Sequence, residues 1–255
     1  MSNNLYMKKI GEKAKLASLN LSNLNIDKRN SVLKQFSQYL GIYSQLILDS
    51  NKKDISNAKF KKIKDSMIDR LKLNNKKIAQ MRNSIEEIIR FKDPIGKTLS
   101  SWKRPNGLII KRVSIPIGVI GVIYESRPNV TSDVSTLCFK AGNVAILRGG
   151  SEAFYSNKIL AKLFKRALKK KKCDENCVQF VESKDRNHVD YLLSSMKNYI
   201  DVIIPRGGKG LVKKVLKKSS IPIIGHYEGL CHVYVDREAD LSMAIKVVNN
   251  SKMRN

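Results

Sequence analysis

The sequence predicts an α/β fold in which a helical N-terminal region precedes a doubly wound, mainly parallel, Rossmann-like sheet. Short, almost unbroken apolar runs recur after residue 118, as expected of strands that are covered on both faces. Amphipathic helical segments separate these runs, and repeated strand–helix–strand alternation gives a parallel sheet with crossover helices. A hydrophobic content of 42% and a charged content of 28% over 255 residues suit a globular chain with a buried core.

Residues 1–93 are predicted to form a helical region. Apolar residues recur at three-to-four spacing over 32–47 and again over 78–89, which indicates one buried helix stripe in each stretch. The asparagines directly before the second stripe are candidate helix caps. The charged stretch 49–64 is predicted to be a helix–loop connection. Core packing explains both stripes, so this region is expected to pack on the domain that follows and to carry no chemistry.

Residues 94–118 are predicted to be a bridging segment. The stretch 100–107 contains a tryptophan, a proline and a glycine, which is typical of a loop. Residues 108–115 then alternate apolar and basic side chains, the pattern of a half-exposed strand. Because an exposed strand can pair with another chain, this strand is a candidate interface for a homo-oligomer.

Residues 119–255 are predicted to hold the sheet. The predicted strands are 119–124, 144–147, 178–181, 201–204, 221–224 and 232–236. The predicted helices are 131–141, 152–168, 188–196, 210–218 and 239–248. Gly142 is well placed to end the first of these helices. Sheets of this kind bind ligands in the loops at the carboxyl ends of their strands, so function is expected in those loops.

Composition excludes several classes of protein. No apolar run approaches the roughly 20 residues that a membrane helix needs, so no membrane association is predicted. The N-terminus lacks the apolar stretch of a secretory signal. Because the 255 residues include only 4 cysteines, a disulfide scaffold is excluded and a cytoplasmic location is predicted.

The formal net charge of +27 raises the alternative of nucleic-acid binding. The basic residues, however, are spread along the chain among asparagines and isoleucines and do not form one tract with interleaved aromatics. Solvated, incidental charge is therefore favoured over a nucleic-acid function. A non-catalytic basic protein that keeps the fold and binds a nucleotide or nucleic acid stays open as the second hypothesis.

Three predicted strand-to-helix loops are distinctive, namely 125–131, 148–152 and 205–210. The last two contain Gly-Gly beside a basic residue, where backbone amides and a helix dipole suit a phosphate group. One Gly-Gly pair can equally form a simple turn, but two such loops on one sheet favour phosphate binding. The six-position glycine fingerprint and the Walker A motif are both absent from the sequence.

Four further segments are distinctive: IGVIGVIYESRPNVT (117–131), KAGNVAILRGG (140–150), IIPRGG (203–208) and CHVYVD (231–236). These segments closely resemble the gamma-glutamyl phosphate reductase family, the proline-biosynthesis branch of the aldehyde dehydrogenase superfamily. The resemblance implies NADPH-dependent reduction of L-glutamyl 5-phosphate to L-glutamate 5-semialdehyde. It also implies a cysteine thiolate that attacks the acyl phosphate to form a thioester, so that one difficult step is divided into two.

The resemblance also assigns roles to residues of this chain. Asn129 corresponds to the amide that helps to bind the oxyanion of the tetrahedral intermediate. Arg148 corresponds to a basic residue near the adenosine ribose, where a cation suits the 2′-phosphate of NADP. Arg127 is our candidate for an anionic group of the substrate. The remaining candidate cofactor-binding residues are Gly149, Gly150, Gly207 and Gly208.

Two structural alternatives stay open for these residues. Asn129 can cap the helix that is predicted to begin at Thr131, because asparagine is a favoured cap. Arg148 can form an ion pair with Glu152, four residues along the chain.

The sequence departs from the family in one respect. Family members carry the nucleophile in a Pro-Ser-Thr-Cys-Asn-like segment shortly after the helix that here ends near Asn250, and the 255 residues contain no such segment. We therefore expect a truncated chain or a separately encoded C-terminal catalytic segment, and no activity of this chain alone. The four cysteines are predicted to be structural or incidental; they are Cys138, Cys173, Cys177 and Cys231. Cys173 and Cys177 are close in sequence but lack a second pair of ligands, so no metal site is predicted.

Overall fold

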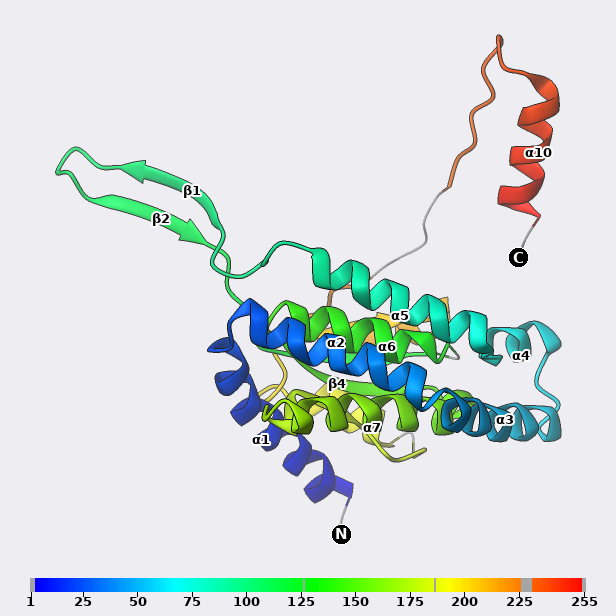
Figure 1. Cartoon of the computed structure of the whole chain (residues 1–255), viewed down its shortest axis with the longest axis horizontal. Coiled ribbons are helices and arrows are strands. Elements are labelled where there is room, and N and C mark those ends of the chain that lie inside the picture. The colour runs from blue at the N-terminus through cyan, green and yellow to red at the C-terminus, as the bar shows by residue number, and fades with distance from the viewer. Residues whose placement is uncertain (1–2, 126, 186, 226–230, 254–255) are drawn as a thin grey trace. The chain divides into compact units, whose positions relative to one another are not determined.

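The computed structural model of the chain describes residues 3–125, 127–185, 187–225 and 231–253. The chain divides into two units, Met1–Gly225 and His226–Asn255. The first unit contains the main sheet, the helices that cover it and a β-hairpin, and the second contains one helix (Figure 1). Among the described residues, no helix is long and apolar enough to cross a membrane.

Within the described residues, the main sheet has four strands, all parallel, in the order β5-β4-β3-β6. The strands are β3 (Val119–Tyr124), β4 (Val144–Gly149), β5 (Val178–Phe180) and β6 (Val202–Arg206). The chain runs from β3 outward to β5 and then adds β6 on the other side of β3. This topology confirms the predicted doubly wound fold and places the reversal of strand order between β3 and β6, where ligands bind in such sheets.

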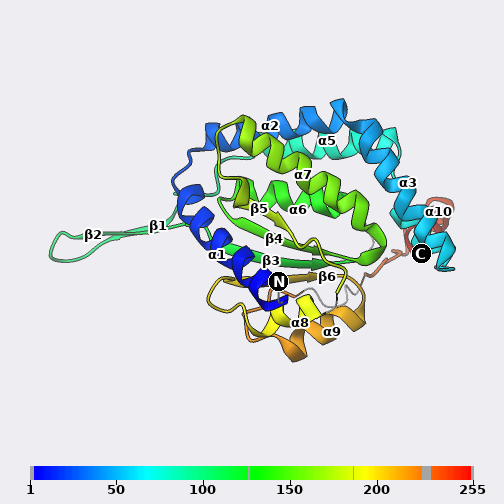
Figure 2. The same cartoon turned by 90° about the horizontal axis from the view of Figure 1, so that it is seen from below.

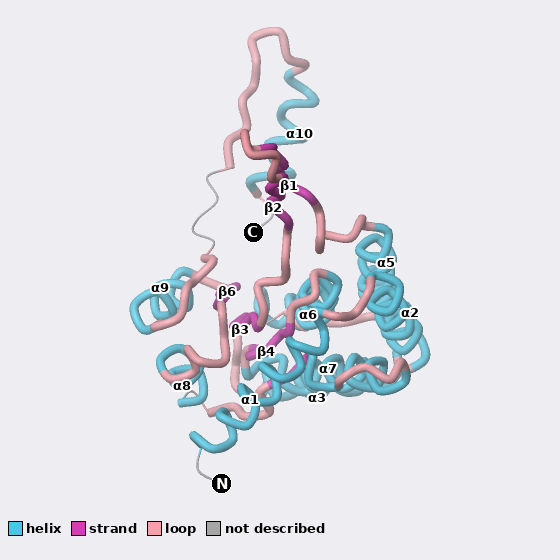
Figure 3. Tube along the Cα trace, turned by 90° about the vertical axis from the view of Figure 1, so that its left-hand side faces the viewer, coloured by secondary structure: helices cyan, strands magenta, loops and turns pink. Residues whose placement is uncertain are grey.

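Helices cover both faces of the sheet (Figures 2 and 3). One face is covered by α6 (Asn129–Lys140) and α7 (Phe154–Lys170), and the other by α1 (Asn3–Ser22), α8 (Asn187–Ser194) and α9 (Lys209–Lys218). An additional layer outside α6 and α7 consists of α2 (Ile26–Ile42) and α5 (Asn75–Arg90). The connection between these two helices contains α3 (Ser44–Phe60), which packs on α7, and α4 (Asp65–Leu71).

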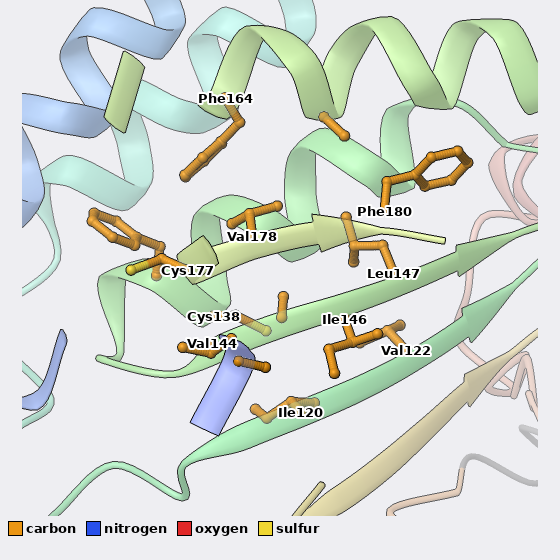
Figure 4. Close-up of a cluster of buried hydrophobic side chains, with 14 of the residues drawn as sticks. Ile120, Val122, Cys138, Val144, Ile146, Leu147, Phe164, Cys177, Val178 and Phe180 are labelled. Atoms are coloured by element: carbon orange, nitrogen blue, oxygen red, sulfur yellow. The ribbon is translucent and has the colours of Figure 1, made fainter. Parts of the chain in front are cut away.

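The core is built on the two central strands, which are buried along their whole length. Figure 4 shows their apolar side chains among those of the neighbouring strand and helices. Phe164 on α7 contacts Phe36 on α2 and Phe139 on α6, with ring centroids 4.7 Å and 5.6 Å apart. The N-terminal helices therefore share one hydrophobic core with the sheet.

A buried arginine connects the outer helical layer to α6. Arg29 on α2 is only 1% exposed. Its guanidinium donates hydrogen bonds to the backbone carbonyls of Lys140, at the end of α6, and Leu24. It also forms an ion pair of 2.6 Å with Asp93, which follows α5. One side chain thus joins three segments that are far apart in the sequence.

The N-terminal helices differ from the prediction. The stripe over 32–47 belongs to two helices, because α2 and α3 are separated by one residue. The predicted connection 49–64 is wrong for most of its length, since α3 continues to Phe60. The buried face of α3 includes Asn51 and Asp54, each 1% exposed, and these polar residues interrupt the apolar periodicity.

Two predicted helix ends are confirmed. The side chain of Asn74 caps α5 by accepting a 2.8 Å hydrogen bond from the backbone amide of Lys77. Gly142 follows the end of α6 with a φ of +72°, a left-handed conformation that glycine adopts without strain.

The bridging segment forms an antiparallel hairpin of β1 (Thr98–Lys103) and β2 (Ile109–Val113). The prediction of a loop over 100–107 is therefore wrong at its start, while the strand within 108–115 is confirmed over a shorter range. Both strands are largely exposed on both faces. Because neither face of β1 is buried, its sequence does not alternate between apolar and polar residues, and the strand could not be predicted from that pattern. Gly107, with a φ of +89°, lies in the turn.

Two other predicted strands are not formed as strands. Residues 221–224 form only one parallel β-bridge, which pairs Ile223 with Ile203 of β6. Residues 232–236 are an exposed loop that pairs with no strand in the described parts of the chain. A β-strand needs a neighbour for its backbone groups, and apolar alternation alone does not supply one.

The second unit contains α10 (Leu241–Lys252), which confirms the helix predicted over 239–248. The side chain of Asp240 caps α10 by accepting a hydrogen bond from the amide of Met243. None of the residues of α10 is buried in this structure.

Candidate functional site

A cavity of about 580 Å³ lies at the carboxyl ends of β3 and β6, where the strand order reverses. The register of the sheet explains this location, because Tyr124 at the end of β3 is paired with Arg206 at the end of β6. The residues that follow both strands line the cavity; they include Glu125, Arg127, Asn129, Arg206, Gly207 and Gly208. The structure therefore brings together four of the predicted site residues, from loops about 80 residues apart in the sequence.

A second hollow of about 440 Å³ shares part of this lining and extends toward α4 and α5. Arg70, Arg127, Asn129 and Asp133 line both cavities, and Lys77 lines the second only. The N-terminal helices thus contribute directly to the site, contrary to the expectation that they only pack. Nothing in the sequence pattern indicated Arg70, since it lies on a short, mostly polar helix far from the signature loops.

Asn129 is the first residue of α6, with Pro128 at the capping position. The helix therefore begins two residues before the predicted start, and Asn129 is not its cap. Its side-chain amide donates a 3.1 Å hydrogen bond to the carboxylate of Asp133, one turn along the helix. Burial raises the pKa of Asp133, and the hydrogen bond from Asn129 opposes that rise. Because a carboxylate accepts only, the contact orients the amide with its nitrogen toward Asp133 and leaves its second N–H available.

A buried chain of hydrogen bonds closes the base of the loop that carries Asn129. The hydroxyl of Tyr124, at the end of β3, lies 2.6 Å from the hydroxyl of Thr131 in the first turn of α6. The Thr131 hydroxyl in turn donates to the side-chain oxygen of Asn157 on α7 at 2.9 Å. Burial raises the pKa of Tyr124, so its hydroxyl stays protonated. These contacts fix both ends of the loop relative to the sheet.

The glycines after β6 face an acidic side chain. The backbone N–H of Gly208, at the start of α9, donates a 2.8 Å hydrogen bond to the carboxylate of Glu125. A Cβ atom at Gly207 would lie 2.6 Å from the carboxyl carbon of Glu125, so a larger residue there would displace this exposed side chain. A carboxylate thus occupies the anion-binding position at the N-terminus of α9.

The predicted residues at the end of β4 lie one strand away and do not line either cavity, and Arg148 and Gly149, predicted to lie in a loop, are the last two residues of the strand. Arg148 is only 6% exposed; it donates to the carbonyl of Gly149, and its Nε has no hydrogen-bond partner among the described residues. Burial lowers the pKa of the Arg148 guanidinium, while the charge of Glu152 opposes the effect. Gly149 has a packing role, because a Cβ atom there would lie 2.2 Å from Nδ2 of Asn157. Gly150 precedes the 3₁₀ turn at the start of α7.

The sequence profile of the aldehyde dehydrogenase family matches residues 3–255, almost the whole chain. The chain belongs to the aldehyde dehydrogenase family. Its α/β architecture and the location of the cavity at the carboxyl ends of β3 and β6 agree with that membership.

Individual relatives within the family carry a more specific name. The gamma-glutamyl phosphate reductase of Bartonella henselae is 44% identical over 97% of this chain and 60% of its own length. That of Desulfotalea psychrophila is 43% identical over 95% of this chain and 58% of its length. The solved gamma-glutamyl phosphate reductase of Thermotoga maritima superposes with a TM-score of 0.90 at 38% identity, covering 97% of this chain and 60% of that one. The chain thus spans about 60% of the length of these relatives.

Cys138, Cys173 and Cys177 of this aldehyde dehydrogenase family member line neither cavity. Cys138 and Cys177 are buried, and burial raises the pKa of each thiol to about 12. Cys173 is half-buried and Cys231 is exposed. In the described parts of the chain, no group of three or more His, Cys, Asp or Glu side chains is arranged to hold a metal ion.

Labelling with iodoacetamide at pH 8 is expected to modify Cys231 rapidly and to leave Cys138 and Cys177 unmodified in the folded protein. A thiol whose pKa is about 12 is ionised at that pH in roughly one molecule in ten thousand, and burial also blocks the reagent. Peptide mass spectrometry after a short exposure measures the result, and urea-unfolded protein is the control in which all sites react. Rapid labelling of Cys138 in the folded protein would contradict the burial described above.

Proposed function

We propose that this chain is the cofactor-binding part of a cytoplasmic gamma-glutamyl phosphate reductase that uses NADPH to reduce L-glutamyl 5-phosphate to L-glutamate 5-semialdehyde in proline biosynthesis. The observation that carries the proposal is the shared lining of one cavity by Asn129, Arg127 and the Gly207–Gly208 turn. An amide donor, a cation and a glycine-rich helix start are what an acyl phosphate and a dinucleotide would need at one place. The names of the relatives support the same activity.

The Gly207–Gly208 turn suits the pyrophosphate of the cofactor. Its backbone N–H groups lie at the positive end of the α9 dipole, where the Gly208 N–H donates to the Glu125 carboxylate in this structure. When bound, NADPH supplies the hydride that reduces the acyl carbon. Arg148 fits the 2′-phosphate in chemistry, since its Nε is a donor without a partner, but it lies one strand from the cavity. Together with Gly149 and Gly150 it is our proposed contact to the adenosine end.

The role of Asn129 follows from its orientation. Asp133 holds one N–H of the amide, and the other is free to donate to the oxygen of an acyl group in the cavity. A fixed neutral dipole of this kind stabilises charge that develops on the oxygen without reorganising during the reaction. Arg127, exposed beside the same cavity, is proposed to bind the phosphate that leaves.

A thiolate nucleophile completes this chemistry, and the family resemblance places it in a segment that residues 1–255 do not contain. The test is an assay of the reverse reaction, phosphate-dependent reduction of NADP by glutamate 5-semialdehyde. Residues 1–255 alone are expected to be inactive, and addition of the remaining segment of the Bartonella henselae relative is expected to give activity. Activity of residues 1–255 alone that disappears in Cys231→Ala would contradict the proposed nucleophile, and no activity in any combination would contradict the proposed function.

Glu125→Gln is expected to bind NADPH about three- to tenfold more tightly than the unchanged chain. The carboxylate competes for the Gly208 N–H and repels a pyrophosphate at short range, so that removing its charge is worth on the order of 1 kcal/mol. Calorimetric titration measures the affinity, and Glu175→Gln, remote from the cavity, is the matched control. Weaker binding in Glu125→Gln would mean that the carboxylate supports the cofactor site and does not obstruct it.

We further propose that the β1–β2 hairpin pairs copies of this chain in a homo-oligomer. Within the described sheets its two strands pair only with each other, so their outer edges are unpaired, and the hairpin exposes Leu99, Trp102, Leu108, Ile109 and Val113. Ile109→Lys is expected to lower the molar mass measured by light scattering to that of one chain. Lys111→Gln, on the same strand, is the control that should leave the assembly unchanged. An unchanged mass in Ile109→Lys would contradict this interface.

A further inference from the structure

Three basic side chains, together with the carboxylates of Asp69 and Asp133, line the hollow that extends from Asn129 toward α4 and α5. Arg70 on α4 and Arg127 after β3 line this hollow, and Lys77 on α5 lines it from the other side. These three cations come from three separate elements, so their convergence is a property of the fold and not of one charged stretch.

The acidic residues of the two cavities already have partners. Asp69 forms a 2.7 Å ion pair with Lys72, and Asp133 accepts from the amide of Asn129. Glu125 accepts from the backbone of Gly208. In the described parts of the chain, no carboxylate lies within ion-pair distance of Arg70 or Arg127. Two arginines that form no ion pair with a described carboxylate, beside a concave surface, attract an anionic ligand.

The backbone that carries Arg70 is firmly held, although its side chain is exposed. The neighbouring Ile68 and Leu71 are buried in a small cluster, and the side-chain amide of Asn51 donates a 2.8 Å hydrogen bond to the carbonyl of Leu71. The carbonyl of Lys72 accepts a hydrogen bond from Lys77, which ties α4 to α5 at the edge of the hollow. An arginine on such a support can present its guanidinium to a ligand at low entropic cost.

We infer that Arg70 and Lys77 bind the α-carboxylate of an amino-acid substrate and thereby select it; this inference rests on the proposed function. If the acyl carbon lies at Asn129, the phosphate attached to that carbon lies beside Arg127. The remainder of the substrate then extends into the hollow toward α4 and α5, where its carboxylate meets Arg70. A guanidinium pairs with a carboxylate through two parallel hydrogen bonds. Both bonds form only when the substrate has the length that places its carboxylate at the guanidinium, so such a substrate binds more tightly. Arg70 is thus a specificity residue contributed by the N-terminal helices.

The test is calorimetric titration of the 255-residue chain with L-glutamate and, separately, with inorganic phosphate. Arg70→Gln is expected to weaken L-glutamate binding roughly 10-fold or more, the effect of losing a charge-assisted contact, and to leave phosphate binding within about twofold. Arg127→Gln is expected to weaken the binding of inorganic phosphate and to leave L-glutamate binding nearly unchanged. Arg82→Gln, an equal charge change on α5 outside both cavities, should leave both affinities unchanged.

Equal L-glutamate affinity in Arg70→Gln and the unchanged chain would overturn the inference, and so would an absence of L-glutamate binding to the unchanged chain. Titration with NADPH separates this result from the proposed function. If the chain bound NADPH but not L-glutamate, the result would contradict the proposed role of Arg70 and leave the proposed function untouched. L-glutamate binding that depends on Arg70, with no reductase activity after the C-terminal segment of the relative is added, would count against the reductase and retain the carboxylate site.

Discussion

Arg29→Ala is expected to lower the free energy of unfolding by about 3 kcal/mol or more, because removing one partner of a buried ion pair leaves its other contacts uncompensated. The substitution would remove the ion pair to Asp93 and the donors to two backbone carbonyls at the same time. One of those carbonyls, of Lys140, lies at the end of α6, the helix that begins with Asn129. Urea unfolding followed by circular dichroism measures the change.

Arg166→Ala is the matched control for this experiment. Arg166 is exposed on α7 and lies over the rings of Tyr39 and Tyr43 at 5.5 Å and 4.8 Å. Its loss is expected to cost about 1 kcal/mol or less, since exposed cation–π contacts are weak. Equal destabilisation by the two substitutions would show that burial of Arg29 contributes nothing beyond an ordinary surface contact.

The sequence was sufficient to predict the sheet because its central strands are covered on both faces. Every residue of β3 and β4 is buried, so that β3, and β4 as far as Leu147, appear as continuous apolar runs. Where burial is achieved with polar side chains, the pattern fails. Asn51 and Asp54 on α3 are buried because they donate to or accept from the backbone near Leu71 and Tyr155, and no hydrophobic periodicity records such contacts.

The part of the candidate site that comes from the loops after β3 and β6 could be predicted from the sequence, because the buried strands before these loops were recognisable. The carboxyl ends of parallel strands lie at one edge of the sheet, so the loops after β3 and β6 were expected at the same edge, and the pairing of β3 with β6 makes them neighbours. The direction of a side chain at a strand end is not fixed by this rule. Arg148 is in register beside Ile123, yet its guanidinium is buried and lines neither cavity. Arg70 reaches the site only through the packing of α4, a tertiary contact that leaves no local signature.

Asn129→Ala is expected to lower kcat of the proposed reductase by about 10²- to 10³-fold, the usual cost of removing one oxyanion donor. The measurement is the reverse assay, performed on the chain supplemented with the C-terminal segment of a relative. The affinity for NADPH, measured separately, is expected to be unchanged, because Gly207 and Gly208 lie on another loop. Stability should also change little, since Asn129 is exposed and its only described side-chain contact is the hydrogen bond to Asp133.

Two further substitutions separate the donor itself from its orientation. Asn129→Asp keeps the size of the side chain but replaces the donor with an acceptor beside Asp133, so it should lose at least as much activity as Asn129→Ala. Asp133→Asn retains a side-chain oxygen that can accept from Asn129, and it also removes a negative charge near the developing oxyanion, so activity should stay within about tenfold of the unchanged chain. If Asn129→Ala retained kcat within threefold while Asp133→Asn abolished it, Asp133 and not Asn129 would be the group on which the reaction depends.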